Sequence, residues 1–173
     1  MYKYLLKLLL VFFLVSCSID TPSVSIAHTT KLAALLETLN VHISSEESLR
    51  LSTEIFQEVA SLRKKFQPVA EPHINNFLIN VGLKEKGLCY QWSDALYHHF
   101  KHKNYKYFEF HLLVANKGEY FFEHNVFVVV AKKGSVMQGV IIDPWRDSKN
   151  VYFSKIKEDK AYQWEQRKER EIL

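Results

Sequence analysis

Cys89 combines a side chain that can act as a nucleophile with a position that favours its reactive form. Gly87 ends the preceding turn, so Cys89 lies in the first turn of a helix predicted to continue to about Lys101. The unpaired backbone N–H groups of a first turn and the positive end of the helix dipole stabilise a thiolate, and these N–H groups can also hold an oxyanion. The alternative is a buried packing cysteine, because Trp92 and Leu96 share its helix face.

A nucleophilic thiol needs a base and a third group that orients the base, and two later segments provide candidates. His124 begins the segment HNVFVVVA and Asp143 ends the segment VMQGVIID, and both segments are typical of strands. A hairpin centred on Lys133-Gly134 would set His124 directly opposite Asp143, whose carboxylate could then accept a hydrogen bond from the ring. A register slip of one residue, or a bulge at Gly139, would change this arrangement.

The segments that must position these residues change in character along the chain. Three- and four-residue spacing of apolar residues predicts helices in the first part, and β-branched and aromatic runs predict strands in the second. Helices followed by strands indicate an α+β domain in which N-terminal helices pack on an antiparallel sheet. The expected helices cover residues 28–40, 44–66, 72–82, 89–101 and 154–173, and the expected strands cover residues 105–115, 119–131 and 136–143.

The order of these motifs resembles the transglutaminase-like branch of the papain-like cysteine hydrolases. The matching residues are Gly87-Leu88-Cys89 before a helix, His124 on a strand, and Asp143-Pro144-Trp145 at the end of the next strand, within about residues 87–146. The resemblance implies a transglutaminase-like or papain-like core. It also implies that Cys89 attacks the carbonyl of a peptide or isopeptide amide, that His124 carries the proton, and that Asp143 orients the histidine.

The sequence departs from the papain-type pattern at the oxyanion donor. That pattern has a glutamine several residues before the cysteine, whereas Leu83 and Lys84 occupy this region here and Gln91 follows the cysteine. The second oxyanion donor is therefore unassigned. Two other functions also stay open: a binding or assembly protein that keeps the fold without turnover, and a thiol-redox protein, although a resolving cysteine is missing.

The N-terminus indicates export and anchoring. Lys3 and Lys7 precede an apolar run, which is the layout of a secretory signal peptide. The end of the run, Leu14-Val15-Ser16-Cys17, resembles the lipobox of bacterial lipoproteins. This resemblance implies lipid attachment to Cys17 and a place in the bacterial cell envelope, and Ser18 is compatible with the periplasmic face of the outer membrane. An uncleaved apolar tail is the alternative.

These observations divide the chain into a signal peptide (1–16), a lipidated tether (17–27) and a single domain (28–173). With Cys17 lipidated, Cys89 would have no disulfide partner within the chain. Cleavage would remove two lysines and lower the net charge from +4 to about +2 (4 minus 2), and no basic stripe is present. We expect a membrane, through the lipid, and a peptide or protein substrate as partners, and no nucleic acid.

The composition limits the class of protein, and the histidines raise the question of a metal site. Hydrophobic residues make up 47% and charged residues 24% of the chain, which excludes a disordered chain or a bundle of membrane helices. A metal site is an alternative role for His98, His99, His102 and His111. A structural zinc site normally requires four nitrogen or sulfur ligands, and the chain has no paired cysteines. We expect no metal and no cofactor.

Overall fold

The computed structural model describes residues 25–69, 71–147 and 149–172. The expected signal peptide, Cys17 and the tether up to residue 24 lie outside these residues. Residues 26 and 27, expected in the tether, instead form the start of the first described helix. Within the described residues, no helix has both the length and the apolar character needed to cross a membrane.

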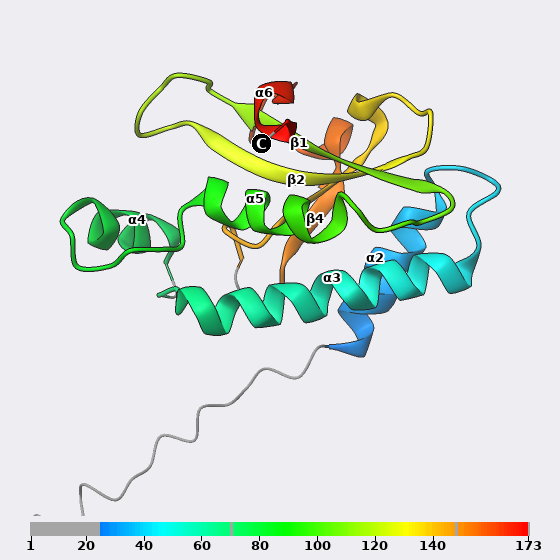
Figure 1. Ribbon diagram of the computed structural model, residues 1–173, viewed down its shortest axis with the longest axis horizontal. Coiled ribbons are helices and arrows are strands. Elements are labelled where there is room, and N and C mark those ends of the chain that lie inside the picture. The colour runs from blue at the N-terminus through cyan, green and yellow to red at the C-terminus, as the bar shows by residue number, and fades with distance from the viewer. Residues whose placement is uncertain (1–24, 70, 148, 173) are drawn as a thin grey trace, which may run out of the picture.

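Helices come first in the chain and strands follow, as expected for the α+β class (Figure 1). The strands form one antiparallel sheet in the order β4-β3-β2-β1-β5. The helices are α2 (Ile26–Glu37), α3 (Ser45–Phe66), α4 (Pro72–Asn80), α5 (Cys89–Phe100) and α6 (Lys168–Glu171), with two 3-10 helices, η1 (Val136–Gln138) and η2 (Ile156–Glu158). The strands are β1 (Phe108–Ala115), β2 (His124–Ala131), β3 (Val140–Asp143), β4 (Tyr152–Lys155) and β5 (Glu165–Gln166).

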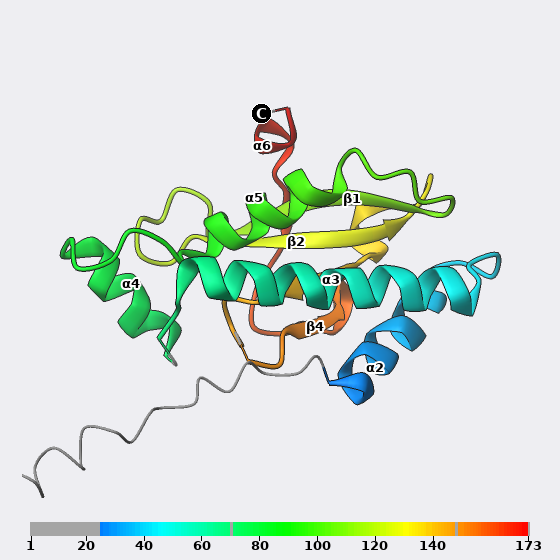
Figure 2. The same ribbon diagram turned by 60° about the horizontal axis from the view of Figure 1, so that its bottom comes forward.

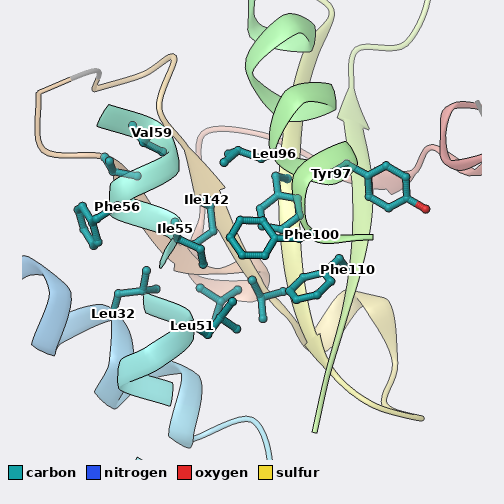
Figure 3. Close-up of a cluster of buried hydrophobic side chains, with 14 of the residues drawn as sticks. Leu32, Leu51, Ile55, Phe56, Val59, Leu96, Tyr97, Phe100, Phe110 and Ile142 are labelled. Atoms are coloured by element: carbon teal, nitrogen blue, oxygen red, sulfur yellow. The ribbon is translucent and has the colours of Figure 1, made fainter. Parts of the chain in front are cut away.

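The first face of the sheet is covered by helices. In two views α5 lies along β2 and α3 runs beside α5 (Figure 1 and Figure 2). Apolar side chains at helical spacing point into this layer, and Figure 3 shows Ile55 of α3 and Phe100 of α5 in one cluster with Phe110 of β1. The predicted packing of N-terminal helices on an antiparallel sheet is therefore confirmed.

The second face of the sheet is covered by the C-terminal segment. Ile156 and Trp164 pack there against Val126, Val128 and Ile141. The prediction of one amphipathic helix over residues 154–173 is wrong, because this segment forms the end of β4, then η2, β5 and the short α6. The second face of the sheet is apolar and must be covered. Burial of large side chains on it stabilises the fold more than the local helix preference of this segment would.

The connection between β1 and β2 also differs from the prediction. The strand expected at 119–131 begins only at His124, and the preceding aromatic residues do not enter the sheet. Tyr120, Phe121 and Phe122 are instead 83%, 75% and 68% exposed. Exposed aromatic clusters of this kind are typical of binding surfaces. This loop lies at the same end of the sheet as the start of α5 (Figure 1).

The register between β2 and β3 is shifted by two residues from the expected one. The expected hairpin places Val126 opposite Ile141, whereas Val128 is its partner in the structure. The prediction that His124 directly opposes Asp143 is therefore wrong. The reason is the connection between the strands, which contains η1 in place of a tight turn. Because the shift is even, His124 and Asp143 still point to the same face and meet diagonally.

Candidate active site

The start of α5 is held by hydrogen bonds to the two residues before Cys89. Gln91 accepts hydrogen bonds from the backbone N–H groups of Gly87 (2.7 Å) and Leu88 (3.0 Å) through its side-chain oxygen. Gln91 therefore fixes the turn before Cys89 and does not face the thiol as an oxyanion donor. The predicted helix face is confirmed, since Cys89 is 7% exposed and Trp92 and Leu96 are buried beside it.

Gly87 has a backbone conformation that other residues avoid. Its φ is +118°, and the buried Asn75 amide donates to its carbonyl at 3.2 Å. An added Cβ would lie 2.5 Å from Asn75 Nδ2. The contact and the positive φ together explain why the chain has a glycine two residues before the thiol.

Replacement of Gly87 by alanine is expected to lower the free energy of unfolding by about 1–3 kcal/mol, because strain at positive φ adds to the contact with Asn75. Urea unfolding of the full chain measures this loss. Gly82→Ala is the matched control, since Gly82 also has positive φ but has no atom within 4 Å of an added Cβ. Equal losses in the two variants would show that the Asn75 contact contributes nothing.

His124 and Asp143 form a buried pair on the second face of the sheet. His124 Nε2 lies 2.6 Å from Asp143 Oδ2, and the two residues are 2% and 1% exposed. Aromatic rings surround the imidazole, which restricts its orientation. The nearest ring centroids are those of Trp145 (4.7 Å), Tyr162 (4.7 Å) and Trp164 (5.6 Å).

The other nitrogen of the His124 ring is available to Cys89. Nδ1 is buried and has no hydrogen-bond partner among the described residues. Burial alone would lower the pKa of His124, but the Asp143 carboxylate and the Cys89 thiol outweigh burial and raise this pKa to about 9. The structure thus brings His124 and Asp143 into contact, and Cys89 interacts with the same imidazole strongly enough to raise its pKa. An imidazolium between a carboxylate and a sulfur is the charge state that stabilises a thiolate.

Asp143 accepts hydrogen bonds from other groups in addition to His124. Its Oδ1 accepts from the backbone N–H groups of Trp145 and Arg146, each at 3.1 Å, and its Oδ2 accepts from Arg146 Nε at 2.6 Å. Burial alone would raise the pKa of Asp143, but His124 and then Arg146 lower it. Arg146 pairs with Asp143 and also, through both terminal nitrogens, with Asp159.

A groove of about 570 Å³ opens beside the sulfur. Cys89 and Asn125 line it, together with α4 and the β1–β2 loop, whereas His124 does not. A substrate in the groove would therefore contact the sulfur directly. The aromatic residues that line the groove are Phe77, Tyr90, Tyr120, Phe121 and Phe122.

No family model, curated protein or solved structure matches this chain.

Sequence reasoning did not find Asn125, Glu123 and Arg167 beside the thiol. Arg167 donates to Asn125 Oδ1 at 2.7 Å and also pairs with Glu123. Burial would raise the pKa of Glu123, but hydrogen bonds from the Gly118 amide, Arg167 and Asn125 lower it to about 2. Only the polar Asn125 inside the apolar run after His124 was a signal. Nothing in the sequence pointed to a C-terminal arginine.

Two of the four histidines considered for a metal site have carboxylate partners. His99 lies 3.0 Å from a carboxylate oxygen of Glu54 and 3.2 Å from one of Glu58, and His111 lies 3.3 Å from Glu171. Across residues 25–69, 71–147 and 149–172, no group of three or more histidine, cysteine or acidic side chains could hold a metal ion.

Proposed function

We propose that this chain is a lipid-anchored cell-envelope protein that uses Cys89, His124 and Asp143 as a cysteine hydrolase or acyltransferase. The observation that carries the proposal is the His124 imidazole. It bonds Asp143 through Nε2, its Nδ1 is buried with no hydrogen-bond partner among the described residues, and Cys89 helps to raise its pKa. The resemblance to transglutaminase-like hydrolases supports these roles. The lipid anchor rests on the lipobox-like sequence before Cys17.

The proposed reaction passes through an acyl-enzyme. The Cys89 thiolate forms a bond to the carbonyl carbon of a peptide or isopeptide amide, and the carbon–nitrogen bond then breaks. The leaving amine takes its proton from the His124 imidazolium. Water then hydrolyses the thioester, or an amine accepts the acyl group. Asp143 keeps the imidazole oriented throughout, because its carboxylate bonds Nε2 at 2.6 Å.

The groove favours a substrate with bulky apolar side chains next to the reacting carbonyl. Its volume falls within the usual range for ligand sites, and aromatic rings form much of its wall. Glu123 is the one acidic residue that lines the groove in the described part of the chain, and Arg167 neutralises it. A substrate held there gains from burial of apolar surface more than from ion pairing.

A binding or assembly protein without turnover is the second candidate. The observation that favours it is the exposure of Tyr120, Phe121 and Phe122, which could hold a protein partner without any reaction. Formation of an acyl-enzyme separates the candidates, because a binding protein does not transfer its ligand to Cys89.

Alkylation of Cys89 by iodoacetamide at graded pH tests the thiolate–imidazolium pair. Near pH 7, His124→Ala is expected to slow alkylation about tenfold or more, because the thiolate loses its counter-charge. His73→Ala is the control, since this histidine lines the same groove and should leave the rate close to that of the wild type. Equal rates for wild type and His124→Ala across the pH range would identify Cys89 as an inert packing residue.

A further inference from the structure

The side-chain amide of Asn125 points at the Cys89 sulfur. Its Nδ2 lies 4.0 Å from Sγ, and the residue is only 4% exposed. Asn125 also lines the groove in which a substrate would lie. A buried amide at this position faces both the nucleophile and the space that a substrate carbonyl would occupy.

Arg167 determines which end of the Asn125 amide faces the thiol. A guanidinium can only donate hydrogen bonds, and Arg167 donates to Asn125 Oδ1 at 2.7 Å. The amide nitrogen must therefore occupy the other side, where it contacts Glu123 Oε1 at 3.3 Å and approaches the sulfur. One of its two N–H groups serves Glu123. The other has only a distant sulfur, which is a weak acceptor.

The backbone provides a second donor at the same place. Cys89 is the first residue of α5, and the N–H group at this position has no acceptor within the helix. The amide nitrogen of Gln91, the glutamine nearest to Cys89 in the sequence, donates to the Glu85 carbonyl at 3.4 Å, and its oxygen accepts from Gly87 and Leu88. The side-chain donor of an oxyanion hole must therefore come from elsewhere.

We infer that Asn125 is a catalytic residue that supplies the side-chain half of an oxyanion hole, with the Cys89 backbone N–H as the other half. This inference rests on the proposed function. When the thiolate attacks, the carbonyl π electrons move to the oxygen, and this oxyanion lies two bonds from the sulfur. A donor that is 4.0 Å from the sulfur can approach that oxygen closely. When the tetrahedral intermediate collapses, an electron pair of the oxygen re-forms the carbonyl π bond. The carbon–nitrogen bond breaks, the amine leaves with the proton from His124, and the hydrogen bond from Asn125 weakens.

Two reactions of the Cys89 thiol, one with an oxyanion and one without, test whether Asn125 stabilises the oxyanion. Acylation of Cys89 by p-nitrophenyl acetate passes through an oxyanion, whereas alkylation by iodoacetamide displaces iodide and forms none. In the full chain, Asn125→Ala is expected to slow acylation about 100-fold and to leave alkylation close to the wild-type rate. Asn80→Ala is the matched control, because this exposed amide lines the same groove. Neither rate should change in the control.

Asn125→Leu keeps the branched shape and the number of heavy atoms of the buried side chain and removes the N–H donor, so it covers the case in which the alanine variant does not fold. The leucine variant should show the same selective loss of acylation. If the wild type is acylated no faster than these variants while its alkylation still depends on His124, then Asn125 does not have this role. That result would leave the proposed function standing. Alkylation independent of His124 would instead overturn the proposed function.

Discussion

The free energy of unfolding is expected to fall by about 3 kcal/mol as the pH rises from 6.5 to 9, because the folded protein holds the proton of His124 more tightly than the unfolded chain does. The ordinary pKa of histidine is 6.5, and the Asp143 carboxylate is the main group that raises the folded value to about 9. The stabilisation is complete below pH 6.5. It is lost as the pH rises through the folded pKa, where the imidazolium deprotonates.

Urea unfolding at several pH values, followed by tryptophan fluorescence, measures this effect. Other groups also titrate in this range, so the difference between wild type and His124→Gln isolates the histidine. The variant should be less stable at pH 6.5 and should lack the decline that we expect between pH 6.5 and 9. His42→Gln removes an exposed histidine and should keep the wild-type decline. An identical decline in His124→Gln would show that His124 is not the titrating group.

The helical half of the fold was predictable because its signals are local. Ser44 caps α3 by accepting a hydrogen bond from the Glu47 amide at 3.2 Å, and Pro72 stands in the first turn of α4. The C-terminal segment was not predictable, because the sheet decides its structure. Trp164 and Ile156 are buried against strands that lie far earlier in the chain, and helical spacing of charges carries no information about that contact.

The contact between His124 and Asp143 was predictable because alternate residues of a strand point to the same face of the sheet. A register shift of two residues keeps both side chains on that face, so the error in the predicted register still left them in contact. Arg146 bonding to Asp143 and Asp159, and Arg167 bonding to Asn125, depend on how distant segments pack. No pattern in a single sequence reports such contacts.

Replacement of Asp143 by alanine is expected to lower the free energy of unfolding by about 3–5 kcal/mol, because it leaves buried donors without their acceptor. The carboxylate accepts from His124, from Arg146 Nε and from two backbone N–H groups, and the residue is 1% exposed. Urea unfolding near pH 7 measures the loss. Glu158→Ala removes an exposed carboxylate nearby and should change stability by less than about 0.5 kcal/mol.

The double variant Asp143→Ala/His124→Ala shows how much of this loss comes from the histidine. If the buried imidazole is the main group left unpaired, removing it as well should recover part of the lost stability, and the two single effects will not add. Additive losses would mean that Asp143 stabilises the fold chiefly through Arg146 and the backbone. Alkylation of Cys89 in Asp143→Ala distinguishes the two cases in the site itself. A slowed reaction near pH 7, in a variant shown to be folded, indicates that the carboxylate maintains the charged imidazole beside the sulfur.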